Sequence, residues 1–174
     1  MKKQNPVKGK TTDRKKIYYA IGAIALIAVY VIAFIIPTKT DQATEETEYK
    51  FMKEGSLTFT DSLNHLITKI DLEISSSDYD TQLGLMFRRS MEMNQGMLFI
   101  FPEEEIRSFW MRNTYISLDM IFVNSDKKIV TIHKNTKTLS DQSYASTEPA
   151  QYVVEVCAGF SDKYSIKTGD KINW

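Results

Sequence analysis

Residues 17–36 form an uncharged run, IYYAIGAIALIAVYVIAFII, and this run divides the chain. An apolar helix of about 20 residues, rising about 1.5 Å per residue, spans the roughly 30 Å hydrocarbon core of a bilayer. Tyr18 and Tyr19 stand at its start, where amphipathic rings favour the membrane interface, and Pro37 follows it as a stop signal. The sequence therefore predicts a transmembrane anchor at residues 17–36.

The segment before this run predicts its orientation. Residues 1–16 carry seven Lys or Arg side chains against one Asp. Because positively charged flanks stay on the cytoplasmic side, this basic tail is expected in the cytoplasm and the C-terminal part outside it, in the periplasm or at the cell surface. A cleaved signal peptide is the alternative, but its apolar core is usually about 7–15 residues long and is followed by a small-residue site. No clear site follows residue 36, so we predict an uncleaved, single-pass anchor.

Residues 37–55 are polar and lack apolar periodicity, as in a linker.

Composition excludes several classes of function. The chain has 22 basic and 22 acidic side chains, which argues against a dedicated nucleic-acid binder. Its single cysteine, Cys157, can form neither an internal disulfide nor a cysteine-rich zinc site. Met91, Met93 and Met97 have a spacing that could hold Cu(I), but core packing is the commoner role of such methionines. No cofactor and no metal is predicted.

Residues 56–174 are expected to fold as one β-rich domain. Apolar and polar residues alternate over 56–61 and 66–75, which predicts two half-buried strands joined in a hairpin. Residues 97–101 are apolar throughout and predict a buried central strand. Further strands are predicted at 107–116, 118–123, 128–133, 151–157 and 171–174.

Helices are expected to cover these strands. Residues 78–93 place Leu83, Met86 and Phe87 on one face at helical spacing, and residues 158–166 predict a second, short helix. The fold class predicted is therefore mainly β (α+β): a compact β-barrel or sandwich-like domain with one or two covering helices.

Four short motifs occur in order within this domain. They are GLMFR at 84–88, GMLFIF at 96–101, FWMRNT at 109–114 and LDMIF at 118–122, followed by Glu155, Gly159 and Gly169-Asp170. This pattern resembles the DUF192 family, also called UPF0127, over roughly residues 57–174. The resemblance implies a β-rich fold, commonly behind a signal peptide or an anchor. It implies no activity, because the family is one of unknown function.

The chain departs from the family pattern at two positions. Ser117 stands where a proline usually precedes the LDMIF motif, and Cys157 stands where asparagine or another small residue is more usual. The second departure argues against a thiol chemistry shared by the family.

Polar and aromatic residues inside the motifs are the candidate ligand-binding residues: Arg88, Trp110, Arg112, Asn113 and Asp119. Asp119 lies in an otherwise apolar strand, and a buried carboxylate needs a charged or hydrogen-bonding partner. Arg88 or Arg112 could be that partner. In a functional interpretation the pair binds a small polar ligand against Trp110. In a structural interpretation the pair is an ion pair that fixes the helix on the sheet.

These observations favour a membrane-tethered binding or accessory module of the cell envelope, with a small ligand or an envelope protein as its partner. A small envelope hydrolase that uses Asp119 with Arg88 or Arg112 is the alternative from another class, and a structural partner of another membrane protein is a third. Asp119 and Glu155 could also divide acid and base roles. Catalysis is the weaker expectation, because neither histidine lies in a motif.

Overall fold

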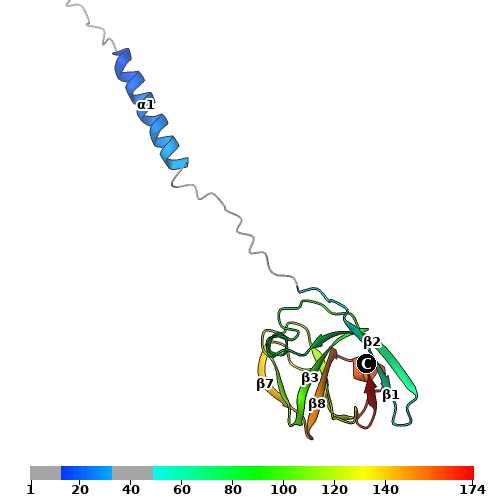
Figure 1. Cartoon of the computed structure of the whole chain (residues 1–174). Coiled ribbons are helices and arrows are strands. Elements are labelled where there is room, and N and C mark those ends of the chain that lie inside the picture. The colour runs from blue at the N-terminus through cyan, green and yellow to red at the C-terminus, as the bar shows by residue number, and fades with distance from the viewer. Residues whose placement is uncertain (1–12, 33–48) are drawn as a thin grey trace, which may run out of the picture. The chain divides into compact units, whose positions relative to one another are not determined.

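The computed structural model describes residues 13–32 and 49–174 of the chain (Figure 1). By its contacts the chain divides into two units, Met1–Glu46 and Thr47–Trp174. The candidate site lies in the second unit.

In the first unit, helix α1 spans Arg14–Tyr30. It begins after Asp13, whose side chain accepts a hydrogen bond from the backbone N–H of Lys15. Within the described residues, no helix combines the length and the apolar character needed to cross a membrane. Parts of the expected tail and anchor, residues 1–12 and 33–36, lie outside the described residues.

In the second unit, seven strands form one sheet in the spatial order β6-β5-β8-β3-β2-β1-β9. Only β2 and β3 run parallel; the other neighbours are antiparallel. Strands β4 and β7 pair in a separate small sheet. The bounds are β1 Gly55–Thr60, β2 Leu66–Ser75, β3 Gln95–Glu105, β4 Ser108–Met111, β5 Leu118–Val123, β6 Ile129–His133, β7 Ser140–Ala145, β8 Ala150–Cys157 and β9 Lys171–Asn173.

Strand β3 occupies the middle of the sheet, as its apolar sequence predicts, and Figure 1 shows it beside β8. Its register places Leu98 opposite Ile74 on β2 and opposite Val154 on β8. Leu98 is fully buried in one core cluster, and the next residue, Phe99, is fully buried in another. Because successive side chains of a strand point to opposite faces, β3 contributes to a core on each side of the sheet.

Different elements cover the two faces. On one face, β1 and β9 curve round to pack with β5, β8 and the short helix α3 (Phe160–Lys163). On the other face, Met111 of β4 and Tyr144 of β7 pack against Met120, Phe122 and Val153 of the large sheet. The small sheet therefore stands over one face of the large sheet, and the candidate site lies on that face.

The mainly β, α+β fold predicted from the sequence is confirmed, but the sheet is not a closed barrel. Its edge strands β6 and β9 do not pair as strands; an isolated bridge between Lys128 and Lys171 joins the segments at their ends. The sheet is therefore strongly curved and remains open.

The helix predicted over residues 78–93 is much shorter than expected. Helix α2 spans Asp78–Leu83, and the Ser77 side chain caps it by accepting a hydrogen bond from the N–H of Asp80. It stops because Gly84 has φ +48° and Phe87 has φ 64°, and both values lie outside the right-handed helical region. The apolar residues that suggested a longer helix instead form an irregular segment.

Candidate functional site

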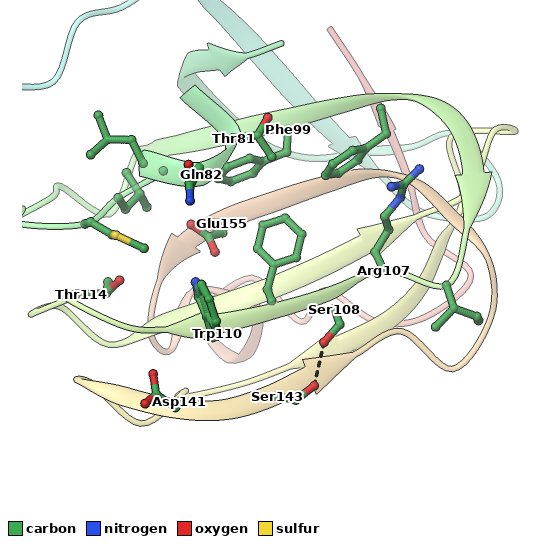
Figure 2. Close-up of a pocket in the computed structure, with 17 residues that line it drawn as sticks. Thr81, Gln82, Phe99, Arg107, Ser108, Trp110, Thr114, Asp141, Ser143 and Glu155 are labelled. Carbon is green, nitrogen blue, oxygen red and sulfur yellow. Dashed lines mark hydrogen bonds between the residues drawn. The ribbon is translucent and has the colours of Figure 1, made fainter. Parts of the chain in front are cut away.

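A cleft of about 400 Å³ opens on the face of the large sheet that the small sheet covers (Figure 2). The segment 81–86, which contains the end of α2, lines one side, and β4 and β7 line the other. Strands β3 and β8 contribute residues between these two sides. The volume falls within the range of about 300–1,000 Å³ that is usual for small-molecule sites.

Aromatic side chains make much of the cleft wall. Phe99, Phe101, Phe109 and Trp110 all line it. Phe109 packs edge-on against Phe99, with ring centroids 5.0 Å apart, and against Phe101 at 6.2 Å. These edge-to-face contacts hold the rings in fixed orientations, so the wall is largely preformed.

Glu155 on β8 is the one acidic group buried in this aromatic wall. The residue is 4% exposed, and Figure 2 shows its carboxyl group pointing into the cleft between Gln82 and Trp110. No described residue donates a hydrogen bond to the carboxyl group or forms an ion pair with it. Burial raises the pKa of Glu155 from its ordinary value of 4.5 to about 8, because the charged form loses its hydration. The side chain is therefore protonated at neutral pH.

The register of the sheet separates Glu155 from Asp119. On β5, Asp119 stands opposite Val156, and Met120 stands opposite Glu155. Val156 belongs to one core cluster and Met120 to the other, so the two acidic side chains point to opposite faces of the sheet. They cannot divide acid and base roles in one site.

Trp110 lines the cleft as the sequence suggests, and it has a neighbour that holds its ring. The Arg112 guanidinium lies 3.9 Å from the centroid of the Trp110 ring, and Arg112 Nε donates to Asp141 Oδ1 over 2.6 Å. Both partners of this ion pair are exposed. Arg112 therefore supports the cleft wall, and its charge is already balanced by Asp141.

Arg107, the cation among the cleft-lining residues, is likewise occupied. Its Nε donates to the carbonyl of Ala150 over 3.3 Å, and its guanidinium pairs with Glu105 and lies 4.0 Å from the Phe101 ring centroid. Its side chain is 13% exposed. Arg107 thus fixes the loop between β3 and β4 and offers no unbalanced positive charge to a ligand.

Asp119 does not form the predicted ion pair with Arg88 or Arg112. It is fully buried, and its carboxylate accepts three backbone hydrogen bonds, from the N–H groups of Asn135 at 2.9 Å, Gly159 at 3.2 Å and Ser161 at 2.8 Å. Backbone amides, which carry no sequence signal, satisfy this charge. Asp119 joins β5 to two loops and has no place in the cleft.

Arg88 pairs instead with Glu73 on β2. Arg88 Nη2 lies 2.6 Å from Glu73 Oε2, and both side chains are nearly buried, at 7% and 8% exposed. Asn113, in a left-handed conformation at φ 55°, accepts a hydrogen bond at its carbonyl from the Phe87 N–H over 2.8 Å. Both residues therefore attach the segment after α2 to the rest of the domain, and neither lines the cleft.

The structure thus brings one of the five candidate residues, Trp110, to the cleft wall, with Arg112 behind its ring. The residue that the candidate set omitted is Glu155. Its signal in the sequence is a lone acid within QYVVEVC, a strand that is otherwise apolar at every position facing a core. Among the described residues, no three His, Cys, Asp or Glu side chains converge as a metal site.

Comparison with known proteins agrees with the sequence motifs. The model of the DUF192 family, described as "Uncharacterized ACR", matches residues 59–174. A UPF0127 protein of Pyrococcus furiosus is 28% identical over 111 residues, which cover 61% of this chain and 88% of that protein.

Two solved structures are similar in fold and sequence. One, described as a candidate transcription regulator from Sinorhizobium meliloti, has a TM-score of 0.66 and 34% identity, covering 72% of this chain and 96% of its own. The other, a protein of unknown function from Novosphingobium aromaticivorans, has a TM-score of 0.63 and 31% identity, covering 68% of this chain and 84% of its own.

The three amide contacts predict that Asp119→Asn is strongly destabilising. An asparagine keeps the size but turns one acceptor into an N–H₂ group that faces a backbone donor. Hydrogen bonds to a charged group are worth about 1.5–3 kcal/mol each, so we expect the free energy of unfolding to fall by about 3 kcal/mol. Urea unfolding of the full chain measures this loss. Asp141→Asn, in an exposed pair, is the control and should cost less than about 1 kcal/mol. Equal losses in the two variants would reject the structural role of Asp119.

The buried carboxyl group of Glu155 should make the stability of the domain depend on pH, and Glu155→Gln should remove this dependence. Because the folded pKa is raised from 4.5 to about 8, the folded chain keeps a proton that the unfolded chain has lost in this window. The stabilisation that the protonated Glu155 gives the folded state is complete below the pKa of the unfolded chain. Above that pH the free energy of unfolding declines by about 1.4 kcal/mol per pH unit, until the pH passes the pKa of the folded chain.

Urea unfolding of wild type and Glu155→Gln, followed by tryptophan fluorescence from about pH 5 to about pH 9, tests this slope. The variant should gain stability relative to wild type as the pH rises, and the gain should level off above about pH 8. A difference that does not change with pH would show that the buried carboxyl group titrates normally.

Proposed function

Because the chain belongs to the DUF192 family, described only as uncharacterized, we propose its function from the cleft: it is a membrane-tethered, extracytoplasmic module that binds a small ligand without transforming it. The ligand occupies the space between the segment 81–86 and the small sheet, with Trp110 as one wall and the Glu155 carboxyl group beside it.

The observation that carries this proposal is the unpartnered carboxyl group of Glu155. Buried polar groups in proteins nearly always have a hydrogen-bond partner, because an unsatisfied one costs about 1–3 kcal/mol. Glu155 is 4% exposed and has none among the described residues, and its carboxyl group faces the aromatic cleft that it lines. A bound molecule that supplies the missing partner accounts for both features.

Binding is favoured over catalysis because no histidine is among the described cleft-lining residues, and the carboxylate that lines the cleft with Glu155, Asp141, is paired with Arg112. His133 packs against Phe122 and Tyr144, and its Nε2 lies 2.7 Å from the carbonyl of Ala145. His65 pairs with Asp61 in the turn between β1 and β2. Neither histidine lines the cleft, and Asp119 faces the opposite side of the sheet, so no reaction is assigned to this site.

The tether is supported by the sequence pattern: the uncharged run at 17–36 follows seven basic residues within 1–16. We predict that an alkaline phosphatase fused after Trp174 is active, because that reporter needs an oxidising compartment outside the cytoplasm. A cytoplasm-specific reporter at the same position should be silent, and the opposite pattern would reject the proposed orientation. A mature N-terminus beyond residue 36 would replace the anchor by a cleaved signal.

Ligand capture tests the binding function. The full chain, purified in mild detergent, is incubated with a small-molecule extract of the producing cells, freed of unbound material by gel filtration, and then denatured so that released compounds can be identified by mass spectrometry. We expect one compound class to be retained by wild type and lost from Trp110→Ala, because that change removes a cleft wall.

The matched control is Trp174→Ala. This tryptophan is also part-exposed, but it packs edge-on against Tyr152, which is not a cleft-lining residue, with ring centroids 4.9 Å apart. It should retain the same compound as wild type. Retention by Trp110→Ala, or retention by none of the three proteins, would count against the proposed site.

A further inference from the structure

We propose that the ligand of this cleft is an organic ammonium ion with an apolar body, whose charged head pairs with the carboxylate of Glu155. This inference rests on the proposed binding function and names the chemical class of the ligand. It is drawn from the charges, the hydrogen bonds and the aromatic surfaces that meet in the cleft.

The charges of the cleft exclude an anion. Arg107 is balanced by Glu105 and is also bonded to backbone carbonyls, while Arg112 is balanced by Asp141. Glu155 is the only ionisable cleft-lining residue for which the described residues provide no counter-charge. An anionic ligand would therefore be buried beside carboxyl groups and π-faces without a free cation, whereas a cationic head meets a free carboxyl group.

The hydroxyl groups of the cleft are already engaged within the protein. Ser108 Oγ lies 2.6 Å from Ser143 Oγ, and Thr114 Oγ1 donates to the Arg112 carbonyl over 3.2 Å. Thr81 Oγ1 lies 3.0 Å from Ser75 Oγ, so it is occupied as well. A sugar or another polyol, which needs several donors and acceptors, would find mainly the Gln82 amide beside Glu155 here. A ligand with one polar head and an otherwise apolar body fits the groups that remain.

Aromatic faces favour a positive head over a neutral one. A cation near the face of a tryptophan or phenylalanine ring is attracted by the negative face of the ring, more strongly where water is excluded. Phe99, Phe109 and Trp110 line the same cleft as Glu155, and Figure 2 shows the Glu155 carboxyl beside Trp110. The same rings supply the surface for the apolar body, so one wall serves both parts of the ligand.

Binding of the ammonium ion displaces one proton. When the cation binds, the protonated carboxyl group of Glu155 loses its proton to solvent. The resulting carboxylate then pairs with the ammonium ion. Met97 of β3 and Met120 of β5, the cross-strand neighbours of Glu155, carry no charge. The nearby charged groups of the cleft are the balanced Arg107 and Asp141, and Cys157 follows on the same strand with a thiol whose pKa burial raises. None of these groups replaces Glu155 as the site of proton release.

The test compares three probes of one shape and different charge: 2-phenylethylamine, 2-phenylethanol and 3-phenylpropanoate. Each is titrated calorimetrically into the full chain near neutral pH, where the amine stays protonated as lysine does. We expect the amine to bind at least about tenfold more tightly than the alcohol and the carboxylate not to bind. Amine affinity should rise about tenfold from pH 6 to pH 7 and level off above pH 8, with release of close to one proton at the lower values.

Glu155→Gln keeps the shape of the side chain but cannot ionise. It should abolish the preference for the amine and its pH dependence, while the weak binding of the alcohol persists. Asp126→Asn, which removes an exposed carboxylate in the turn between β5 and β6, is the matched control and should behave as wild type.

The outcomes separate the two proposals. If the alcohol binds as tightly as the amine at pH 8, where Glu155 is ionised most, and Trp110→Ala abolishes both, the cleft is a binding site but the ammonium inference is wrong. If the amine preference survives in Glu155→Gln, the inference is also wrong. If no probe binds while ligand capture succeeds, the ammonium inference fails alone; if capture fails as well, both proposals fail.

Discussion

The close approach of β3 and β8 at Gly96 is the constraint on which the cleft depends. A Cβ atom at this position would lie 2.9 Å from the carbonyl oxygen of Glu155 and 3.0 Å from Val156 Cγ1, so any side chain would push the two strands apart. Strand β8 also pairs with β5, and the small sheet packs on the same face. A shift of β8 would therefore move Glu155 relative to every wall of the cleft.

The family motifs contain residues that support the cleft as well as residues that line it. Gly84 turns the chain away from α2 over Phe99, where an added Cβ would lie 3.3 Å from the ring. Arg88 and Asn113 then attach the segment that follows. Such residues preserve the shape of a binding site without touching a ligand. The same motifs also carry wall residues, such as Phe99, Phe109 and Trp110, so they contain both the support and much of the surface of the cleft.

Sequence patterns predicted most of the sheet because each strand faces a core with a regular period. The hairpin of β1 and β2 and the fully buried β5 follow this rule. Strand β7 (Ser140–Ala145) was not predicted, since its polar sequence exposes most of its length and only Tyr144 is buried. The site was harder to predict because Asp119 is satisfied by backbone amides, whereas Glu155 has no partner within the described part of the chain. Neither situation leaves a pattern of complementary side chains.

The pairing of β1 with β9 has a consequence for how the domain is made. Thr58, in the first strand synthesised, pairs with Asn173, in the last, so this ladder closes a loop over nearly the whole domain. Contacts of such long sequence separation form late, and a ribosome builds the chain from its N-terminus. The sheet cannot be completed until translation has passed residue 173. Until then the nascent chain lacks its last edge strand, and the edge of β1 that pairs with β9 stays open.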